Sequence, residues 1–213
     1  ACNPCAAKAC NPCNPCAATN PCAANNPCAA SACNPCNPCA AGAPVELTNA
    51  EAAAAYDCLY PEIKAAYSNT GIPATRNWRA WAKRFSTVPY VSATHGGRLV
   101  NNYSNSAGAE EYGRFEDLEK MPVNSVLIKD SFTVGANGTM SVGPLFIMEK
   151  MGAGFNPDTG DWRYYMLTPD GKLMGITKGT NSAGLAFCHE CHIGGEDSDY
   201  MMFLPDDYRV TSN

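Results

Sequence analysis

The first 44 residues are built almost entirely from four residue types, and this segment limits what the chain can fold into more than any other feature. Ala, Cys, Asn and Pro fill 40 of the 44 positions, and none of the 44 is aromatic, acidic or a large aliphatic residue. Such a composition cannot bury enough apolar surface to offset the entropy lost on ordering. We therefore predict a repeat extension over residues 1–44, followed by a single domain over residues 45–213.

The extension contains the unit Asn-Pro-Cys seven times. Because proline holds the preceding residue out of the helical region, successive turns or short extended steps are expected there. Three interpretations of its ten cysteines are open. They form disulfides that staple a small secreted module, they present Cys-x-x-Cys thiolates to an additional soft metal ion, or the segment is a spacer with no specific role.

Only one Cys-x-x-Cys pair in the chain is followed directly by histidine, namely Cys188 and Cys191 with His192. This pattern is the attachment signature of c-type haem, in which both sulfurs bind the porphyrin vinyl groups and the imidazole binds the iron. We therefore predict one covalent haem c, with His192 as the metal ligand. A zinc site built from Cys188, His189, Cys191 and His192 is the competing interpretation, and four ligands within five residues are too compact for good tetrahedral geometry.

The cysteine count also bears on assembly and location. Removing the two motif cysteines from 13 leaves 11, an odd number, so at least one is expected to be unpaired or joined to another molecule. We hypothesise that the extension helps to hold a homodimer or larger homo-oligomer together. Cysteine density, haem attachment and a chain that starts at Ala1 instead of Met indicate export to the periplasm or the extracellular space.

The overall charge excludes other classes of partner. The formal charge of −5, from 15 basic and 20 acidic side chains, gives no footprint for nucleic acid. No run approaches the roughly 20 apolar residues of a membrane-spanning helix. A redox partner protein or a small substrate is the expected partner.

Residue patterns in the domain predict an α+β fold that is mainly antiparallel sheet. Thr48 or Asn49 can cap a first short helix that reaches about Cys58, and Pro61 can open a second one that reaches Tyr67. Helical spacing of apolar residues is also present over residues 76–85 and 107–120. Strands are expected at 97–103, 124–134, 139–150 and 162–168, and a short helical piece near residue 183 precedes the haem motif.

Several short runs share their order and spacing with one known family. They are Asn77-Trp78-Arg79-Ala80-Trp81, Thr94-His95-Gly96, Asn101-Asn102, Met121-Pro122 to Lys129-Asp130, Met148-Glu149-Lys150, Gly160-Asp161-Trp162, and the haem motif followed by Asp197-Ser198-Asp199-Tyr200. Residues 76–203 thereby resemble the cytochrome P-460 family, to which the cytochromes c-prime-beta are related. The resemblance implies a mono-haem periplasmic protein, commonly dimeric, with a largely antiparallel β-sheet, and it does not include the extension.

The resemblance also suggests a function. In the cytochromes P-460 a lysine is linked covalently to the porphyrin, and five-coordinate iron oxidises hydroxylamine. Lys129 matches that lysine, which makes it a candidate haem cross-link and catalytic residue. A solvent-facing lysine is the alternative, because strand alternation alone does not show which face meets the haem. We expect an oxidoreductase acting on hydroxylamine or a related small nitrogen compound, or alternatively a non-enzymatic electron-transfer or nitric-oxide-binding cytochrome.

The second axial position of the iron has one histidine candidate. His95 is the only histidine outside the motif, and a structural hydrogen-bonding role is equally open for it. Ligation by His95 would suit electron transfer, whereas an open position could bind hydroxylamine or nitric oxide. Catalysis would also need a proton acceptor, for which the candidates are Glu149, Asp161 and Glu190. Aromatic and methionine side chains at 187 and 200–203 can pack on a porphyrin or form ordinary core.

Overall fold

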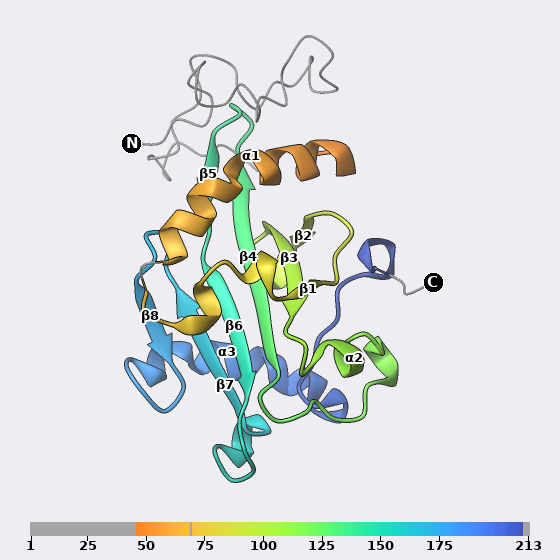
Figure 1. Ribbon diagram of the computed structural model, residues 1–213, viewed down its shortest axis with the longest axis vertical. Helices are drawn as coiled ribbons and strands as arrows, with labels where there is room; N and C mark the ends of the chain where they lie inside the picture. Colours follow the sequence, from red (N-terminus) through yellow and green to blue (C-terminus); the bar gives the residue numbers. More distant parts are fainter. Residues whose placement is uncertain (1–45, 69, 211–213) are drawn as a thin grey trace. The chain divides into compact units, whose positions relative to one another are not determined.

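The structure is a computed structural model that describes residues 46–68 and 70–210. The Asn-Pro-Cys extension, with its expected disulfides, additional metal and assembly role, lies outside these residues. Over the described residues the chain forms an eight-stranded antiparallel sheet with short helices (Figure 1), which confirms the predicted mainly antiparallel α+β class. No helix in this part of the chain has the length and apolar character needed to cross a bilayer.

The strands follow the order β1, β3, β4, β6, β7, β8, with β2 beside β3 and β5 beside β4. Their bounds are β1 Lys83–Arg84, β2 Tyr90–Ser92, β3 Arg98–Ser104, β4 Val126–Val134, β5 Met140–Val142, β6 Leu145–Lys150, β7 Trp162–Leu167 and β8 Leu173–Ile176. The α-helices are α1 Asn49–Ser68, α2 Ala109–Tyr112 and α3 Ala186–His192. Short 3-10 turns are η2 Pro73–Thr75, η3 Trp78–Ala80, η4 Ala93–His95, η5 Phe115–Asp117, η6 Pro157–Thr159, η7 Ser182–Leu185, η8 Ile193–Ser198 and η9 Asp206–Tyr208.

Contacts divide the chain into two compact units. The described residues up to Ala66, Val88–Val100 and Ser131–Gly143 form the first unit. The second consists of Tyr67–Thr87, Asn101–Asp130 and the described residues from Pro144 onward. Strands β3 and β4 contribute residues to both units.

The first unit is built around α1. The helix begins with a capping box, in which the Thr48 hydroxyl accepts a hydrogen bond from the Glu51 amide at 3.3 Å and the Glu51 carboxylate accepts one from the Thr48 amide at 2.7 Å. Its buried side chains recur every three or four residues, which places them on one face. One of them, Tyr56, packs on Phe132 of β4 with ring centroids 5.8 Å apart.

The expectation of two short helices at the start is wrong, because α1 runs from Asn49 to Ser68 with Pro61 inside it. Proline within a helix removes one backbone hydrogen bond and normally kinks or ends the helix. Leu59 and Ile63, on either side of the proline, are both fully buried. Their packing keeps the two segments in one helix.

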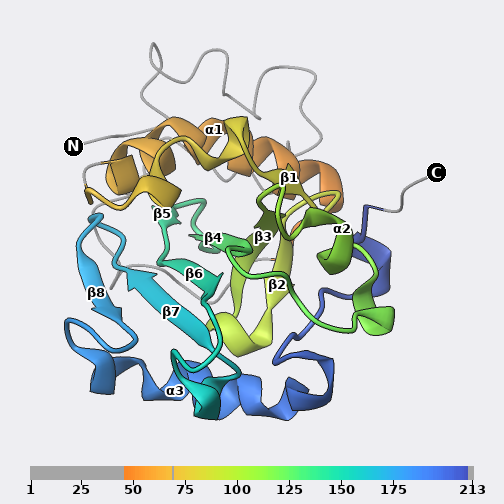
Figure 2. The ribbon, with the colours of Figure 1, turned by 60° about the horizontal axis from the view of Figure 1, so that its bottom comes forward.

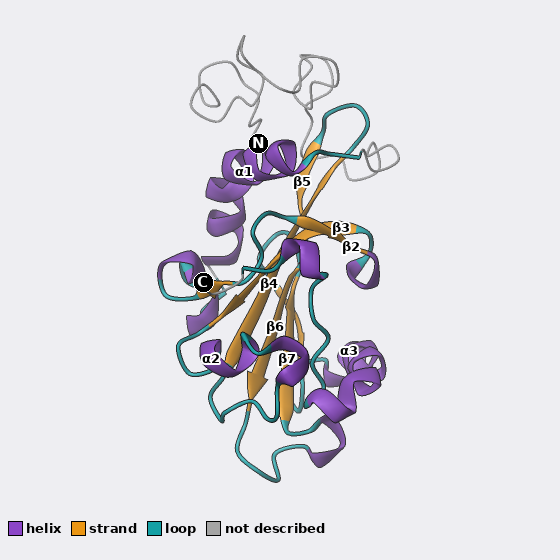
Figure 3. Ribbon diagram, turned by 90° about the vertical axis from the view of Figure 1, so that its right-hand side faces the viewer, coloured by secondary structure: helices purple, strands orange, loops and turns teal. Residues whose placement is uncertain are grey.

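The second unit contains the ladder of β4, β6, β7 and β8, with α3 on one side of it. Figures 2 and 3 show α3 along one side of β6 and β7. Its apolar core takes side chains from this ladder, from the segment around α2 and from the region of α3. One glycine allows a close approach here, because a Cβ atom on Gly175 of β8 would lie 2.9 Å from Leu185 Cγ of η7.

Two expected helices are much shorter than predicted. Over residues 76–85 only η3 is helical, because Asn77 adopts a left-handed conformation and Lys83–Arg84 join the sheet. Over residues 107–120 the helix stops after α2, where Gly113 follows and Phe115 has a positive φ of 51°. The apolar spacing in both segments therefore reflects burial in turns, as for Trp78, which is fully buried.

The strands were predicted more accurately than the helices. β3, β4 and β7 match expectation within two residues at each end. The expected strand at 139–150 is divided into β5 and β6, with Gly143 and Pro144 between them. Proline cannot donate to a sheet ladder, so it marks such a break. The short strands β1, β2 and β8 were missed.

Candidate haem attachment site

The three motif residues lie on neighbouring positions of α3. Since an α-helix repeats about every 3.6 residues, Cys188, Cys191 and His192 fall on one side of it. Cys188 is partly buried against the core, whereas Cys191 is exposed. Burial is the main cause that raises the pKa of the Cys188 thiol to about 11.

His192 is held in a defined orientation. Its Nδ1 lies 2.8 Å from the carbonyl oxygen of Tyr200, and because a carbonyl can only accept, Nδ1 carries the proton. Burial lowers the pKa of His192, which favours the neutral ring. Nε2 then carries the lone pair that can bind a metal. The same arrangement occurs when a backbone carbonyl orients a metal-binding histidine through its other ring nitrogen.

The Tyr200 carbonyl is positioned by its neighbour Asp199. Both residues have positive φ, at 53° for Asp199 and 66° for Tyr200. Aspartate tolerates this conformation better than most residues, whereas a tyrosine adopts it only when its surroundings impose it. Lys150 supplies much of that constraint, because its buried Nζ donates to Asp199 Oδ1 at 2.5 Å and to the Gly160 carbonyl at 2.7 Å.

Two further hydrogen bonds complete this arrangement. The Met121 amide donates to Asp199 Oδ2 at 2.9 Å, and the Trp162 indole donates to the Asp199 carbonyl at 2.7 Å. The ammonium group of Lys150 also lies 4.9 Å from the Trp162 ring centroid. We call Lys150, Asp199 and Trp162 the Asp199 clamp. It fixes the segment after α3 to strands β6 and β7.

The register of the sheet decides which face Lys129 occupies. Leu127 pairs with Met148, and Met148 pairs with Tyr164, so these three side chains share one face. Because the same apolar cluster includes Leu185 and Cys188, this face meets η7 and α3. Lys129, two residues from Leu127 on β4, belongs to it.

Lys129 thereby comes within electrostatic reach of the motif. The residue is partly accessible, but burial around its ammonium group lowers its pKa to about 8, and a Cys191 thiolate opposes that shift. Its positive charge in turn contributes to lowering the pKa of His192. The structure thus brings together Lys129 and the motif residues, which are about 60 positions apart in the sequence.

The neighbouring residue Asp130 points to the opposite face. It is fully buried, and its carboxylate accepts hydrogen bonds from the Trp78 indole at 3.1 Å and from the Asn101 amide at 2.9 Å. These three residues come from separate runs that carry the family resemblance. Their role in this structure is to join η3, β3 and β4.

Two buried polar atoms beside the motif have no hydrogen-bond partner among the described residues, Tyr164 Oη and His189 Nδ1. The Tyr164 ring centroid lies 5.5 Å from that of His192. Burial is the main cause that raises the pKa of Tyr164, and the electrostatic effect of neighbouring groups, Cys188 first among them, adds to it. The hydroxyl therefore stays protonated. Buried polar groups without partners are uncommon in proteins and often mark a site that a further group completes.

His95 belongs to the first unit, whereas Lys129 and the motif belong to the second. Its Nδ1 lies 2.9 Å from the Ser92 hydroxyl and 3.2 Å from that of Thr94. Both contacts are within its own turn. The hydrogen-bonding role expected for His95 is therefore present, and its role as an iron ligand stays a prediction.

The three candidate proton acceptors lie in different places. Glu149 alternates with Met148 on β6, so it faces away from the motif side and accepts a hydrogen bond from the Tyr165 hydroxyl. Asp161 accepts one from the Asn156 amide at 2.8 Å within the turn before β7. Glu190 is exposed on α3.

The residues present fit a covalently attached haem. Two cysteines and an oriented histidine share one side of α3, and an unpartnered hydroxyl lies beside them. Among the flanking side chains, Tyr200 and Met201 are buried, whereas Phe187 and Met202 are exposed. Within the described ranges, no group of three or more His, Cys, Asp or Glu residues is placed to hold a metal ion. A haem iron takes only its axial ligands from the protein.

Neither the protein-family models nor the curated proteins contain a match to this chain. The site is therefore defined by its own geometry.

Sequence reasoning missed Tyr164 and the roles of Lys150 and Asp199. Lys150 and Asp199 stand within the runs that carry the resemblance, but nothing in their spacing joins residues 49 positions apart. Tyr164 follows the alternating pattern of β7, which marks it only as one of several inward-facing residues. Its missing hydrogen-bond partner becomes visible only in three dimensions.

Proposed function

We propose that this chain is an exported mono-haem c-type cytochrome, attached through Cys188 and Cys191 and ligated by His192. The observation that carries the proposal is the hydrogen bond from His192 Nδ1 to the Tyr200 carbonyl. It gives the imidazole the tautomer and orientation that an axial ligand requires. The Asp199 clamp supports the same carbonyl from β6 and β7.

We further propose that the site acts on hydroxylamine or a related small nitrogen compound. A bound haem would supply an iron that binds such a molecule and accepts its electrons. Lys129 would lie on the strand face that meets α3, where its pKa of about 8 leaves part of the population as the neutral, nucleophilic amine near neutral pH. Leu127, Met148 and Tyr164 would exclude water from this face.

One observation favours the alternative, a cytochrome that transfers electrons or binds nitric oxide without turnover. Of the candidate proton acceptors, Glu149 lies on the other face of the sheet, Asp161 is engaged in its own turn, and Glu190 is exposed on α3. Without an acceptor at the iron, oxidation of hydroxylamine would be slow. The periplasmic location, the redox partner and the homo-oligomeric state belong to the same proposal.

Covalent haem is the first property to test. The chain would be produced in a host that matures c-type cytochromes, and haem would be assayed by peroxidase staining after denaturing electrophoresis and by pyridine haemochrome absorbance. Full-length protein should retain haem, and a Cys188→Ala, Cys191→Ala double variant should lose it. Cys58→Ala, at a cysteine outside the motif, is the matched control and should retain it. Wild-type protein without covalent haem would refute the proposal.

The reaction is tested separately on the haem-loaded protein. Oxidation of hydroxylamine with an artificial electron acceptor would be followed for wild type and Lys129→Met. Turnover by wild type supports the enzymatic version, and its absence in a correctly loaded protein leaves the electron-transfer or nitric-oxide-binding version. A haem-peptide mass with an additional bond to Lys129 would identify the cross-link, and an ordinary haem-peptide mass would exclude it.

A further inference from the structure

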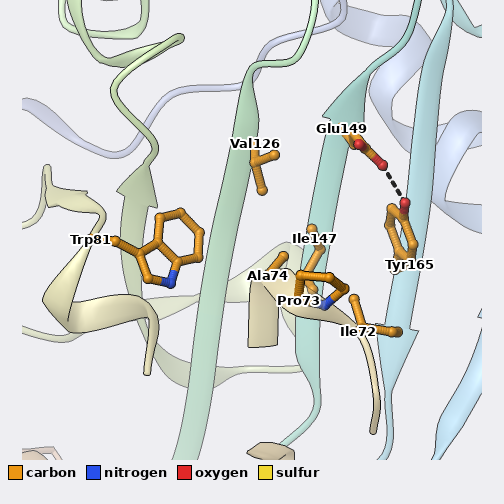
Figure 4. Close-up of a pocket in the computed structure, with 8 residues that line it drawn as sticks. All are labelled: Ile72, Pro73, Ala74, Trp81, Val126, Ile147, Glu149 and Tyr165. Carbon is orange, nitrogen blue, oxygen red and sulfur yellow. Dashed lines mark hydrogen bonds between the residues drawn. The ribbon is translucent and has the colours of Figure 1, made fainter. Parts of the chain in front are cut away.

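A concave site lies on the face of the sheet opposite the motif. It is a cavity of about 320 Å³ within the second unit, shown in Figure 4. Val126, Ile147, Glu149 and Tyr165 form its floor, and the register places all four on the face that does not carry Lys129. This volume is in the range of small-molecule sites.

The cavity is mainly apolar. Ile72, Pro73 and Ala74, at the start of η2, lie over Ile147. Trp81 forms the end of the cavity farthest from Tyr165 in Figure 4. The Trp81 indole nitrogen donates to the Arg76 carbonyl at 3.0 Å, which holds the ring in place. Although 39% of Trp81 is exposed, its ring is fixed and available for stacking.

The opposite end is polar. The Tyr165 hydroxyl donates to Glu149 Oε2, and Arg163 lies 3.6 Å from the same oxygen. The other carboxylate oxygen, Oε1, accepts no hydrogen bond from any residue within 46–68 and 70–210. The positive charge of Arg163 balances the negative charge of Glu149. This end of the cavity therefore offers a hydrogen-bond acceptor, Glu149 Oε1, without a net charge.

We propose that this cavity binds a small uncharged aromatic molecule that carries one hydroxyl or N–H donor. The aromatic ring packs between Trp81 and the wall at Ile147, and the donor bonds to Glu149 Oε1. Because Glu149 and Arg163 pair, this end offers no net charge to attract an anion or a cation, and either ion would lose hydration on entering. An anion also has no donor for Glu149 Oε1. A molecule without a donor makes no such bond and displaces the water that reaches this partly exposed carboxylate. The inference is independent of the proposed haem chemistry.

Three probes of the same size separate these contributions. 2-Naphthol has one donor, naphthalene has none, and 2-naphthoate is anionic at pH 7. Isothermal titration of the full-length protein should rank their affinities in that order. The 2-naphthol dissociation constant should be at least about tenfold below that of naphthalene, as expected for a hydrogen bond to a charged acceptor. Equal affinities for the three probes, or no saturable binding of 2-naphthol, would overturn the proposal.

Variants locate the binding. Glu149→Ala should remove the preference for 2-naphthol over naphthalene, and Trp81→Ala should weaken both. Val123→Ala is the control, since Val123 is an exposed apolar residue that does not line the cavity. Unfolding midpoints would show whether each variant is folded. If folded Glu149→Ala binds all three probes as wild type does, the probes bind elsewhere and the assignment is wrong. Probe binding that disappears as protein concentration rises would also contradict the proposal. It would mean that a second copy of the chain occupies the cavity.

Discussion

Tyr164 and Tyr112 are both almost fully buried, yet their hydroxyl groups are in opposite situations. Tyr112 Oη accepts a hydrogen bond from the Asn102 amide at 2.8 Å, whereas Tyr164 Oη has no partner among the described residues. We predict that Tyr112→Phe costs about 1 kcal/mol of unfolding free energy or more, because it removes a buried hydrogen bond that the Asn102 amide donates. Tyr164→Phe should cost less than about 0.5 kcal/mol in the haem-free chain.

Urea unfolding of the two variants measures this difference directly. Both substitutions replace tyrosine with phenylalanine at a buried position, so the change in the free energy of burying the side chain is nearly the same in the two variants. Equal losses in the two variants would mean that Tyr164 Oη has a partner in solution, such as an ordered water molecule.

Lys129 gives the haem-free chain a specific pH dependence. Its pKa of about 8 in the folded state lies below the roughly 10.4 of an unfolded lysine, so between these values the unfolded chain binds more protons. The contribution of Lys129 to stability should therefore rise as pH increases from about 8 to about 10. Lys129→Met removes the buried charge, so its gain over wild type should be largest below pH 8 and shrink above it.

The measurement is urea unfolding of wild type and Lys129→Met at pH 7 and pH 9.5. Lys172→Met is the control, because Lys172 is exposed and Asp170 raises its pKa. Its difference from wild type should not decrease in the same way. If Lys129→Met is more stable than wild type by the same amount at both pH values, the Lys129 ammonium group of the wild type is solvated.

The residue types of the site could be predicted from the sequence, but not their contacts. Local spacing defines Cys188, Cys191 and His192, because one helical turn brings them together. The face of Lys129 depends on strand pairing, since alternation on β4 is compatible with either face. The left-handed backbone at Asp199 and Tyr200 has no local signal such as glycine, because tertiary contacts impose it.

At the scale of elements, the Asp199 clamp determines how the segment after α3 is attached to the sheet. Lys150 and Asp199 form an ion pair whose side chains are 3% and 9% exposed. Removing one partner of a buried pair leaves the other charge uncompensated, which typically costs about 3 to 5 kcal/mol. For Asp199→Asn we predict a loss of unfolding free energy near the lower end of that range. Asparagine keeps a polar side chain, and an Asn residue tolerates the left-handed backbone conformation.

A double-mutant cycle with Lys150→Met tests the pair. The double variant should be less destabilised than the sum of the singles, with a coupling energy of about 1 to 3 kcal/mol. The exposed pair Lys172 and Asp170 is the reference, and it should couple by less than about 1 kcal/mol. Additive losses at Lys150 and Asp199 would show that the clamp does not act as a unit.

Elements were predictable where one local rule governs them. Alternation over β3, β4 and β7 and the cap at Thr48 correspond to the structure. The helices failed where tertiary packing outweighed a local signal. Burial of Leu59 and Ile63 carries α1 through Pro61, and the sheet takes up Lys83–Arg84 after a single helical turn.

At the scale of the whole molecule, the described core residues all come from Ala52 to Leu204. No aromatic or large aliphatic side chain is available from residues 1–44. We therefore predict that deleting residues 1–44 leaves the thermal unfolding midpoint and the haem content per chain essentially unchanged. Near-ultraviolet circular dichroism and the haemochrome assay would check this, with an export leader supplied in the same way to both forms.

The same deletion tests the role assigned to the extension. Sedimentation of the full-length and shortened proteins, with and without reductant, should show larger assemblies only for the full-length chain. A shortened protein that loses its fold would contradict the division at residue 44. Identical assemblies in both forms would instead remove the extension from any role in association.

Strand β4 carries residues of both proposed sites, and this limits which changes in its sequence both sites could tolerate. Lys129 faces the haem motif, while Val126 on the other face lines the cavity. Loss of one codon between these two positions would shift the strand by one place and exchange its faces. The carboxylate of Asp130 would then stand where the amine of Lys129 does now. Point substitutions can adjust either site separately, but loss of a single residue between Val126 and Lys129 would put both side chains on the same face, so only one of the two could keep its present position.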